Sequence, residues 1–185
     1  GDGDGVIDFG ETIELTVALH NIGLADAEAV SGTLQSDSPH VTLIAPTRGF
    51  GTIPSGGTTS NPQPFVLEIA NGIGDGEDLD LTLNVTENPS TIALDLAATA
   101  PAYHAFVAVM DDGAGDGDGM ADPNELVRLT VRLDNLGGCA TPDLSAVLHG
   151  DGYFVTDETP HPFGVIHAGE SGLATGFTVQ IPPDC

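Results

Sequence analysis

The chain repeats itself, and this repeat constrains its fold more than any other feature of the sequence. Asp2 recurs as Asp116 and Glu11 as Glu125, a spacing of 114 residues that the glycines and alternating apolar residues between them also keep. A sequence that recurs over such a distance encodes the same folding unit twice. We therefore predict two copies of one module, residues 1–100 and 101–185, which meet near Thr99-Ala100-Pro101.

Within each copy the apolar residues alternate with polar or small ones. In the first copy the alternation runs from Ile13 to Leu19, and in the second from Val127 to Leu133. This period of two is typical of a half-buried strand. Similar runs lie at 29–35, 41–44, 65–69, 79–86, 92–98, 104–110, 144–149, 153–156 and 177–181. No segment of 12 residues has a helical period, and 25 glycines, 13 prolines and no tryptophan fit a strand-and-turn protein. The pattern predicts an all-β chain of two tandem immunoglobulin-like β-sandwich modules.

An acidic loop directly precedes the predicted strand that begins at Ile13 in the first copy and at Val127 in the second. The second loop can be laid on the twelve-residue EF-hand loop, in which carboxylates alternate with glycine turns and a glutamate closes the site. The candidate ligands there are Asp116, Asp118, the Met120 carbonyl, Asp122 and Glu125. In the first copy they are Asp2, Asp4, the Val6 carbonyl, Asp8 and Glu11. Ala114 occupies the first ligand position of the second loop, so Asp112, Asp111 or a water must supply that oxygen.

This residue pattern points to calcium. Ca²⁺ is a hard cation that takes about six to eight oxygen ligands, and alternating aspartates with glycine turns wrap a chain around it. A solvated Asp-Gly turn without metal is the alternative. Two copies in the same register, each closed by a glutamate directly before a strand, favour two structural Ca²⁺ sites. Because strands flank the loops, we expect clamps at strand entrances and not sensors.

The chain contains two cysteines, Cys139 and Cys185, both among glycine or proline residues. Such loop-like surroundings favour one disulfide in an oxidising compartment over two buried thiols. Asn84-Val85-Thr86 matches the acceptor pattern for N-glycosylation, which matters only if the source glycosylates secreted proteins.

The charge of the chain excludes several classes of partner. Three Lys+Arg residues face 28 Asp+Glu, giving a formal net charge of −25. Nucleic acid and anionic membrane surfaces need clustered positive charge, so neither is expected as a partner. No apolar run reaches the length of a membrane helix. The six histidines have no zinc-ligand spacing, and no nucleophile or phosphate-loop motif is present, so we expect no enzyme activity.

One motif of the chain is Gly-Asp-Gly-Asp-Gly-x-x-Asp-x-Gly-Glu, followed by Leu-Thr-Val-x-Leu-x-Asn-x-Gly, Phe-Gly-x-Ile and Ile-Pro-Pro-Asp-Cys. This combination resembles a known family. It is similar to the calcium-associated immunoglobulin-like repeats, of the CARDB adhesion type, in bacterial secreted and cell-surface proteins. The resemblance covers nearly the whole chain. It implies a β-sandwich, an extracellular location and calcium in the acidic loops, and it implies no catalytic activity. Asn124 in place of Gly10, and Ala114, depart from the pattern.

Neither copy of the repeat contains all the strands found in the other. The first has no counterpart of the run 104–110, and the second has none for 79–86 and 92–98. We expect either an excerpt of a longer array or strands supplied by neighbouring copies of the chain through β-augmentation. The predicted function is a calcium-stabilised extracellular repeat protein, a subunit of a surface fibre or filament assembled head-to-tail. The alternative is an adhesive or carbohydrate-contacting module of a secreted hydrolase or adhesin. Sugar binding favours exposed tryptophan and tyrosine rings. The chain has no tryptophan and only two tyrosines, Tyr103 and Tyr153.

Overall fold

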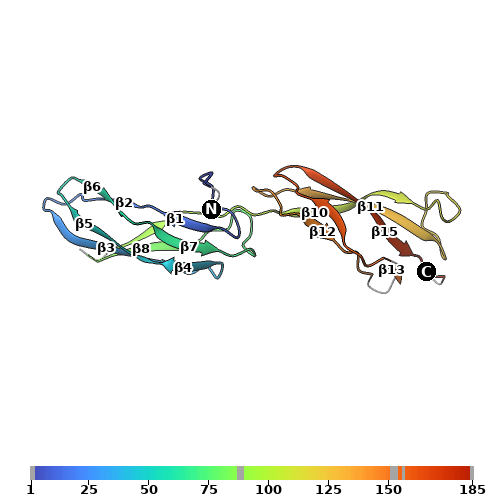
Figure 1. Ribbon diagram of the computed structural model, residues 1–185, viewed down its shortest axis with the longest axis horizontal. Helices are drawn as coiled ribbons and strands as arrows, with labels where there is room; N and C mark the ends of the chain where they lie inside the picture. Colours follow the sequence, from blue (N-terminus) through green and yellow to red (C-terminus); the bar gives the residue numbers. More distant parts are fainter. Residues whose placement is uncertain (1–2, 87–89, 151–153, 156, 184–185) are drawn as a thin grey trace. The chain divides into compact units, whose positions relative to one another are not determined.

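The computed structural model describes residues 3–86, 90–150, 154–155 and 157–183. Over these residues the chain is all-β, with several antiparallel sheets and no helix, which confirms the predicted fold class at that level. The chain divides into two compact units, Gly1–Ala100 (unit 1) and Pro101–Cys185 (unit 2) (Figure 1). In the ranges described, no helix has the length and apolar character that crossing a membrane requires.

The described part of unit 1 contains nine strands. They are β1 (Thr12–Leu15), β2 (Ala18–His20), β3 (Ala27–Ser36), β4 (Val41–Ala45), β5 (Thr47–Ile53), β6 (Thr58–Ser60), β7 (Phe65–Ile69), β8 (Leu81–Val85) and β9 (Ser90–Leu94). Their sheet orders are β1-β7-β4, β2-β6 and β5-β3-β8-β9. The alternating burial along β7 and β8 shows why the sequence has a period of two, since every second side chain points into the core.

The core of unit 1 lies between these sheets. Phe65 of β7 and Leu83 of β8 are fully buried in one cluster, although they belong to different sheets. A second cluster joins Leu67 and Ile69 of β7 to Leu81 of β8. The two sheets therefore pack face to face, with one apolar interior.

Six strands lie in the residues of unit 2 that the structure describes. They are β10 (Tyr103–Asp111), β11 (Leu126–Asn135), β12 (Leu144–Ala146), β13 (Phe154–Val155), β14 (His161–Gly164) and β15 (Ser171–Gln180). The sheet orders are β10-β11-β15-β13 and β12-β14. Val127, Ile166 and Phe177 are buried at its centre. By contrast, every residue of β10 is exposed, including Val107 at 52% and Val109 at 55%.

The structure interrupts one strand that the sequence predicts as continuous. The run from Ile13 to Leu19 is divided into β1 and β2 at Thr16 and Val17. The reason is the buried side chain of Asn61, whose Oδ1 accepts a hydrogen bond of 2.7 Å from the backbone N of Val17. The corresponding strand of unit 2, β11, is unbroken.

Several short strands have no counterpart in the predicted set. β6, with the sequence Thr-Thr-Ser, and β14, with His-Pro-Phe-Gly, carry no alternating apolar residues. They form because they pair with β2 and β12, which is a tertiary effect that local pattern does not record. The run predicted at 92–98 is also shifted, since β9 covers Ser90–Leu94.

Candidate metal centre

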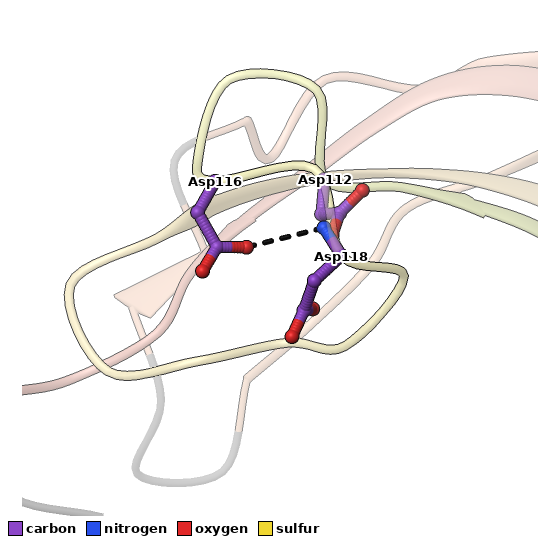
Figure 2. Close-up of side chains that lie close together, drawn as sticks. All are labelled: Asp112, Asp116 and Asp118. Atoms are coloured by element: carbon purple, nitrogen blue, oxygen red, sulfur yellow. Dashed lines mark hydrogen bonds between the residues drawn. The ribbon is translucent and has the colours of Figure 1, made fainter.

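Three carboxylates meet in the loop between β10 and β11. Asp112, Asp116 and Asp118 each offer a carboxylate oxygen, and these atoms lie within 4.8 Å of one another (Figure 2). Asp116 and Asp118 are exposed, whereas Asp112 is only 8% exposed. Among the residues that the structure describes, no other group of three His, Cys, Asp or Glu side chains has such a geometry.

Backbone amides of the same loop orient these carboxylates. Asp112 Oδ2 accepts a hydrogen bond from the N–H of Gly119 at 2.7 Å. Asp116 accepts one from the N–H of Asp118 at 3.1 Å, drawn as the dashed line in Figure 2, and Asp118 accepts one from Met120 at 2.8 Å. Each aspartate therefore keeps one or more oxygen lone pairs available on the inner side of a tightly wound loop.

The geometry decides which aspartate takes the place left by Ala114. Asp111 is the last residue of β10, and its carboxylate turns back to accept a hydrogen bond of 2.9 Å from the N–H of Gly113. Asp112 instead joins the group with Asp116 and Asp118. The sequence leaves Asp112, Asp111 or a water open for this position, and of the two aspartates Asp112 is the one placed to act as a ligand.

Glu125 closes the loop at the start of β11. Its side chain is buried, with Oε1 accepting from the N–H of Asp116 at 2.8 Å and Oε2 from the N–H of Asp122 at 2.9 Å. Its carbonyl accepts from Ile181 at 2.8 Å, which fixes the backbone beside the end of β15. A Cβ atom at Gly115 would lie 1.9 Å from Glu125 Oε1 and 2.8 Å from its Cγ, so any other residue there would have to displace the Glu125 side chain. The sequence alone does not indicate this steric role, because nothing in it distinguishes Gly115 from the other glycines of the loops.

The carboxylates affect one another's ionisation. The pKa of Asp122 is raised, first by partial burial and then by the negative charges of Asp118, Glu125, Asp116 and Asp112. Four acidic neighbours thus oppose the ionisation of a fifth. A bound divalent cation would remove this repulsion and favour the ionised forms of the whole group.

The acidic loop of unit 1 has the same local hydrogen bonds. The N–H of Val6 donates to Asp4 at 2.7 Å, as Met120 donates to Asp118. The N–H of Asp8 donates to Glu11 Oε2 at 3.2 Å, as Asp122 donates to Glu125. The N–H of Ile69 donates to the Glu11 carbonyl at 2.8 Å, as Ile181 does to Glu125.

The backbone turns agree as well. Gly3 and Gly5 have φ values of +83° and +89°, and their equivalents Gly117 and Gly119 have +77° and +88°. Asn124 has a φ of +68°, close to the +74° of its equivalent Gly10. Asparagine tolerates this left-handed conformation better than most residues, so the substitution leaves the turn intact.

The first loop nevertheless differs from the second. Asp2 lies outside the described residues, and the carboxylate of Asp8 accepts a hydrogen bond from the Thr99 hydroxyl. Asp4, Asp8 and Glu11 do not come together as a group of three in the way that Asp112, Asp116 and Asp118 do. At the 114-residue spacing, the equivalent of Asp112 falls before Gly1.

The remaining sequence-predicted sites have the following places. Cys139 is half-buried and Cys185 lies outside the described residues, so the disulfide stays a prediction. Asn84 is on β8, between β3 and β9, where its Nδ2 donates to Gln35 and its Oδ1 accepts from Thr91. A glycan attached to Nδ2 would compete with the hydrogen bond to Gln35, whereas Oδ1 would still be able to accept from Thr91. His161 packs against the ring of Phe177 at a centroid distance of 4.3 Å, and its Nε2 lies 3.3 Å from Asp157 Oδ2.

No protein-family model matches the chain, and no curated protein matches it.

Proposed function

We propose that this protein is a calcium-stabilised structural repeat protein of the extracellular surface. It consists of two immunoglobulin-like β-sandwich modules, each with an EF-hand-like loop that leads into β1 or β11. The observation that supports this most directly is the meeting of Asp112, Asp116 and Asp118 beside the buried Glu125. No enzymatic role is proposed.

In unit 2 the ligands would be the carboxylates of Asp112, Asp116, Asp118, Asp122 and Glu125 and the carbonyl of Met120. An oxygen-only ligand set on a flexible loop fits Ca²⁺ better than zinc, which prefers sulfur and imidazole. The ion would join the end of β10 to the beginning of β11, because Asp112 directly follows Asp111 and Glu125 directly precedes Leu126. Its role there would be mechanical, since it ties two neighbouring strands at their loop.

In unit 1 the second ion would be held by Asp2, Asp4, the Val6 carbonyl, Asp8 and Glu11. The shared hydrogen bonds and glycine conformations of the two loops support the same use for both. Extracellular calcium modules of this kind work at free concentrations of about 0.1–1 mM, which are found outside cells. A strongly acidic chain with no lysine fits such a location.

Assembly with copies of itself, head-to-tail, is part of the proposal. It is supported by the exposed apolar side chains of β10 and by the outer strand β1 of unit 1. Open strand edges pair readily with further strands.

The test is thermal unfolding of the chain with and without calcium. A ligand that binds only the folded state stabilises it by about 2.7 kcal/mol at a hundredfold excess over its Kd. We expect Ca²⁺ to raise Tm by several degrees, EDTA to reverse this, and isothermal titration to give two sites. A control with equal Mg²⁺ should produce a smaller shift. A melting curve that is the same in Ca²⁺ and EDTA would rule the proposal out.

A further inference from the structure

Two clefts with partly apolar linings lie beside β1 and β2 in unit 1, and we refer to them together as the groove. In the sheet order β1-β7-β4, β1 is the outer strand, and β2 pairs with β6. One cleft along this edge, of about 690 Å³, is lined by Ile7, Ile13, Leu15 and Leu96 among others. A second, of about 480 Å³, is lined by Leu19, Val30, Val85 and Ile92 among others. Residues of β1 and β2 line these clefts on one side, and Leu96, Ser90 and Ile92 contribute from β9 and the segment that follows it. The acidic loop also lines the first cleft, and β3, β5 and β8 also line the second.

Unit 2 shows what occupies the equivalent edge. The counterpart of β1 and β2 at the 114-residue spacing is β11, and β10 pairs with β11 along its whole length. Opposite Val107, Ala105 and Met110 of β10 stand Val131, Leu133 and Leu129 of β11. The equivalents of these three in unit 1 are Val17, Leu19 and Leu15. Two of them line the groove.

The opposite wall has apolar surface that such a strand would cover. Ile92 of β9 is 39% exposed and lines the second cleft, although it pairs with the fully buried Leu83 of β8. Partners in an antiparallel pair point to the same face of the sheet, so Ile92 faces the interior side. The Ile92 side chain is exposed because it borders the open space of the second cleft.

We propose that this groove binds an extended strand with the residue pattern of β10, presented by another repeat, in antiparallel register with β1 and β2. Backbone hydrogen bonds to the outer edge of β1 would supply affinity, and the two clefts would accept every second side chain. The inference rests on the proposed function as a repeat protein, for which it names the acceptor surface and the donor strand.

The register has a consequence for the first acidic loop. In unit 2, β10 leads directly into Asp112, the buried carboxylate of the metal group. A strand of this pattern in the groove would bring the same carboxylate to the loop that contains Asp4, Asp8 and Glu11. Strand binding and calcium binding at unit 1 therefore strengthen each other.

The experiment uses the whole chain, isotope-labelled, and a synthetic peptide of residues 101–113 in the presence of Ca²⁺. We expect saturable changes of the NMR signals of β1, β2 and β9. No binding would overturn the inference, and so would changes confined to β11 and β15, which would mean exchange with the chain's own β10. The melting test with EDTA does not involve the peptide. If calcium stabilised the chain but the peptide did not bind, this inference would be wrong and the proposed calcium-stabilised function would stand.

Matched variants test the faces. In the peptide, Val107→Asp places a charge in the groove and should weaken binding about tenfold or more. Phe106→Asp changes the opposite face, which in unit 2 lies under Arg132, and should have less than about a twofold effect. In the chain, Ile92→Lys should weaken binding, whereas Ile44→Lys should not, since the exposed Ile44 is on β4 at the far edge of the sheet. Equal effects within either pair would contradict the proposed orientation.

Two further peptides test the register and the metal link. Asp111 faces Arg128 in unit 2, and the equivalent of Arg128 in unit 1 is the exposed Glu14. Asp111→Lys should therefore tighten peptide binding by about two- to fivefold, and weaker binding would overturn the register. The native peptide should raise the apparent calcium affinity of unit 1, and Asp112→Asn should abolish this gain. The same gain with both peptides would show that Asp112 supplies no ligand.

Discussion

Asn21 and Asn135 hold equivalent corners of the two units with the same hydrogen bonds. Each side-chain amide donates to two backbone carbonyls, and each Oδ1 accepts from the N–H two residues further on, Gly23 at 2.9 Å or Gly137 at 3.1 Å. The carbonyl acceptors are those of Ala25 and Ile53 in unit 1, and those of Cys139 and Ile166 in unit 2. The two units thus share a tertiary contact as well as a sequence pattern.

We expect Asn135→Ala to destabilise unit 2 by about 2–3 kcal/mol, because it leaves buried carbonyls without donors. Asn135 is 0% exposed, while Asn21 is only half-buried, so Asn21→Ala should cost less, about 1 kcal/mol. Chemical denaturation of both variants measures the difference. A larger loss from Asn21→Ala would contradict this account.

The second prediction concerns Gly115. In Gly115→Ala the new Cβ must displace the carboxylate of Glu125, and with it the hydrogen bonds to Asp116 and Asp122. We expect the calcium affinity of unit 2 to fall about tenfold or more, with the unit 1 site unchanged. Gly49→Ala is the control, since nothing lies within 4 Å of a Cβ at that position. Calcium titration by calorimetry distinguishes the two variants.

Glu125→Gln should lower calcium binding in unit 2 while it preserves the shape of the side chain. The amide keeps an acceptor oxygen but loses the negative charge and one of the two carboxylate oxygens that a bidentate ligand needs. Glu11→Gln should do the same in unit 1, and Glu170→Gln, at an exposed position, should do neither. Equal losses at both sites from either single variant would show that the units are not independent.

Much of the fold can be predicted from the sequence, because in two sheets that pack face to face every second side chain of a strand is apolar and buried. Val127 and Leu133, for example, are buried on the inner face of β11, and Arg128 is exposed on the outer face. The interruption at Val17 could not be predicted in this way. It depends on Asn61, a residue 44 positions away that is brought beside it only by the tertiary fold.

The candidate site was predictable in its residue types but not in its full ligand set. Spacing alone identifies Asp116, Asp118 and Glu125, since the EF-hand pattern is local to the loop. Asp112 and Asp111 are adjacent in sequence, and the choice between them depends on where β10 ends. The end of β10 depends on the length of the loop and on the direction in which the strand leaves the sheet. The spacing of the acidic residues indicates neither.

The pH dependence of unit 2 should include a contribution from Asp134 on β11. Its pKa is lowered, first by the hydrogen bond from the Ser171 hydroxyl and then by the one from Arg132. A carboxylate with a lowered folded-state pKa stabilises the fold above its unfolded pKa of about 3.9, and this stabilisation is lost as pH falls through the folded value. Ser171→Ala should raise the Asp134 pKa, and Ser145→Ala on β12 should not. NMR titration of the Asp134 carboxyl carbon measures both, and equal midpoints in the two variants would contradict the assignment.

Asn124 and Gly10 occupy equivalent turns but should respond differently to exchange. Asn124→Gly should change stability by less than about 0.5 kcal/mol, whereas Asn124→Ala should cost about 1 kcal/mol, because alanine tolerates a φ of +68° less well. In the reverse exchange a Cβ at Gly10 would lie 2.3 Å from Asn71 Oδ1, so the Asn71 side chain would have to move. Gly10→Asn should therefore be the more damaging variant, although it copies the residue that unit 2 uses. Urea unfolding of the three variants measures these differences in stability. If Gly10→Asn left the stability unchanged, the contact with Asn71 would not restrict the turn at Gly10.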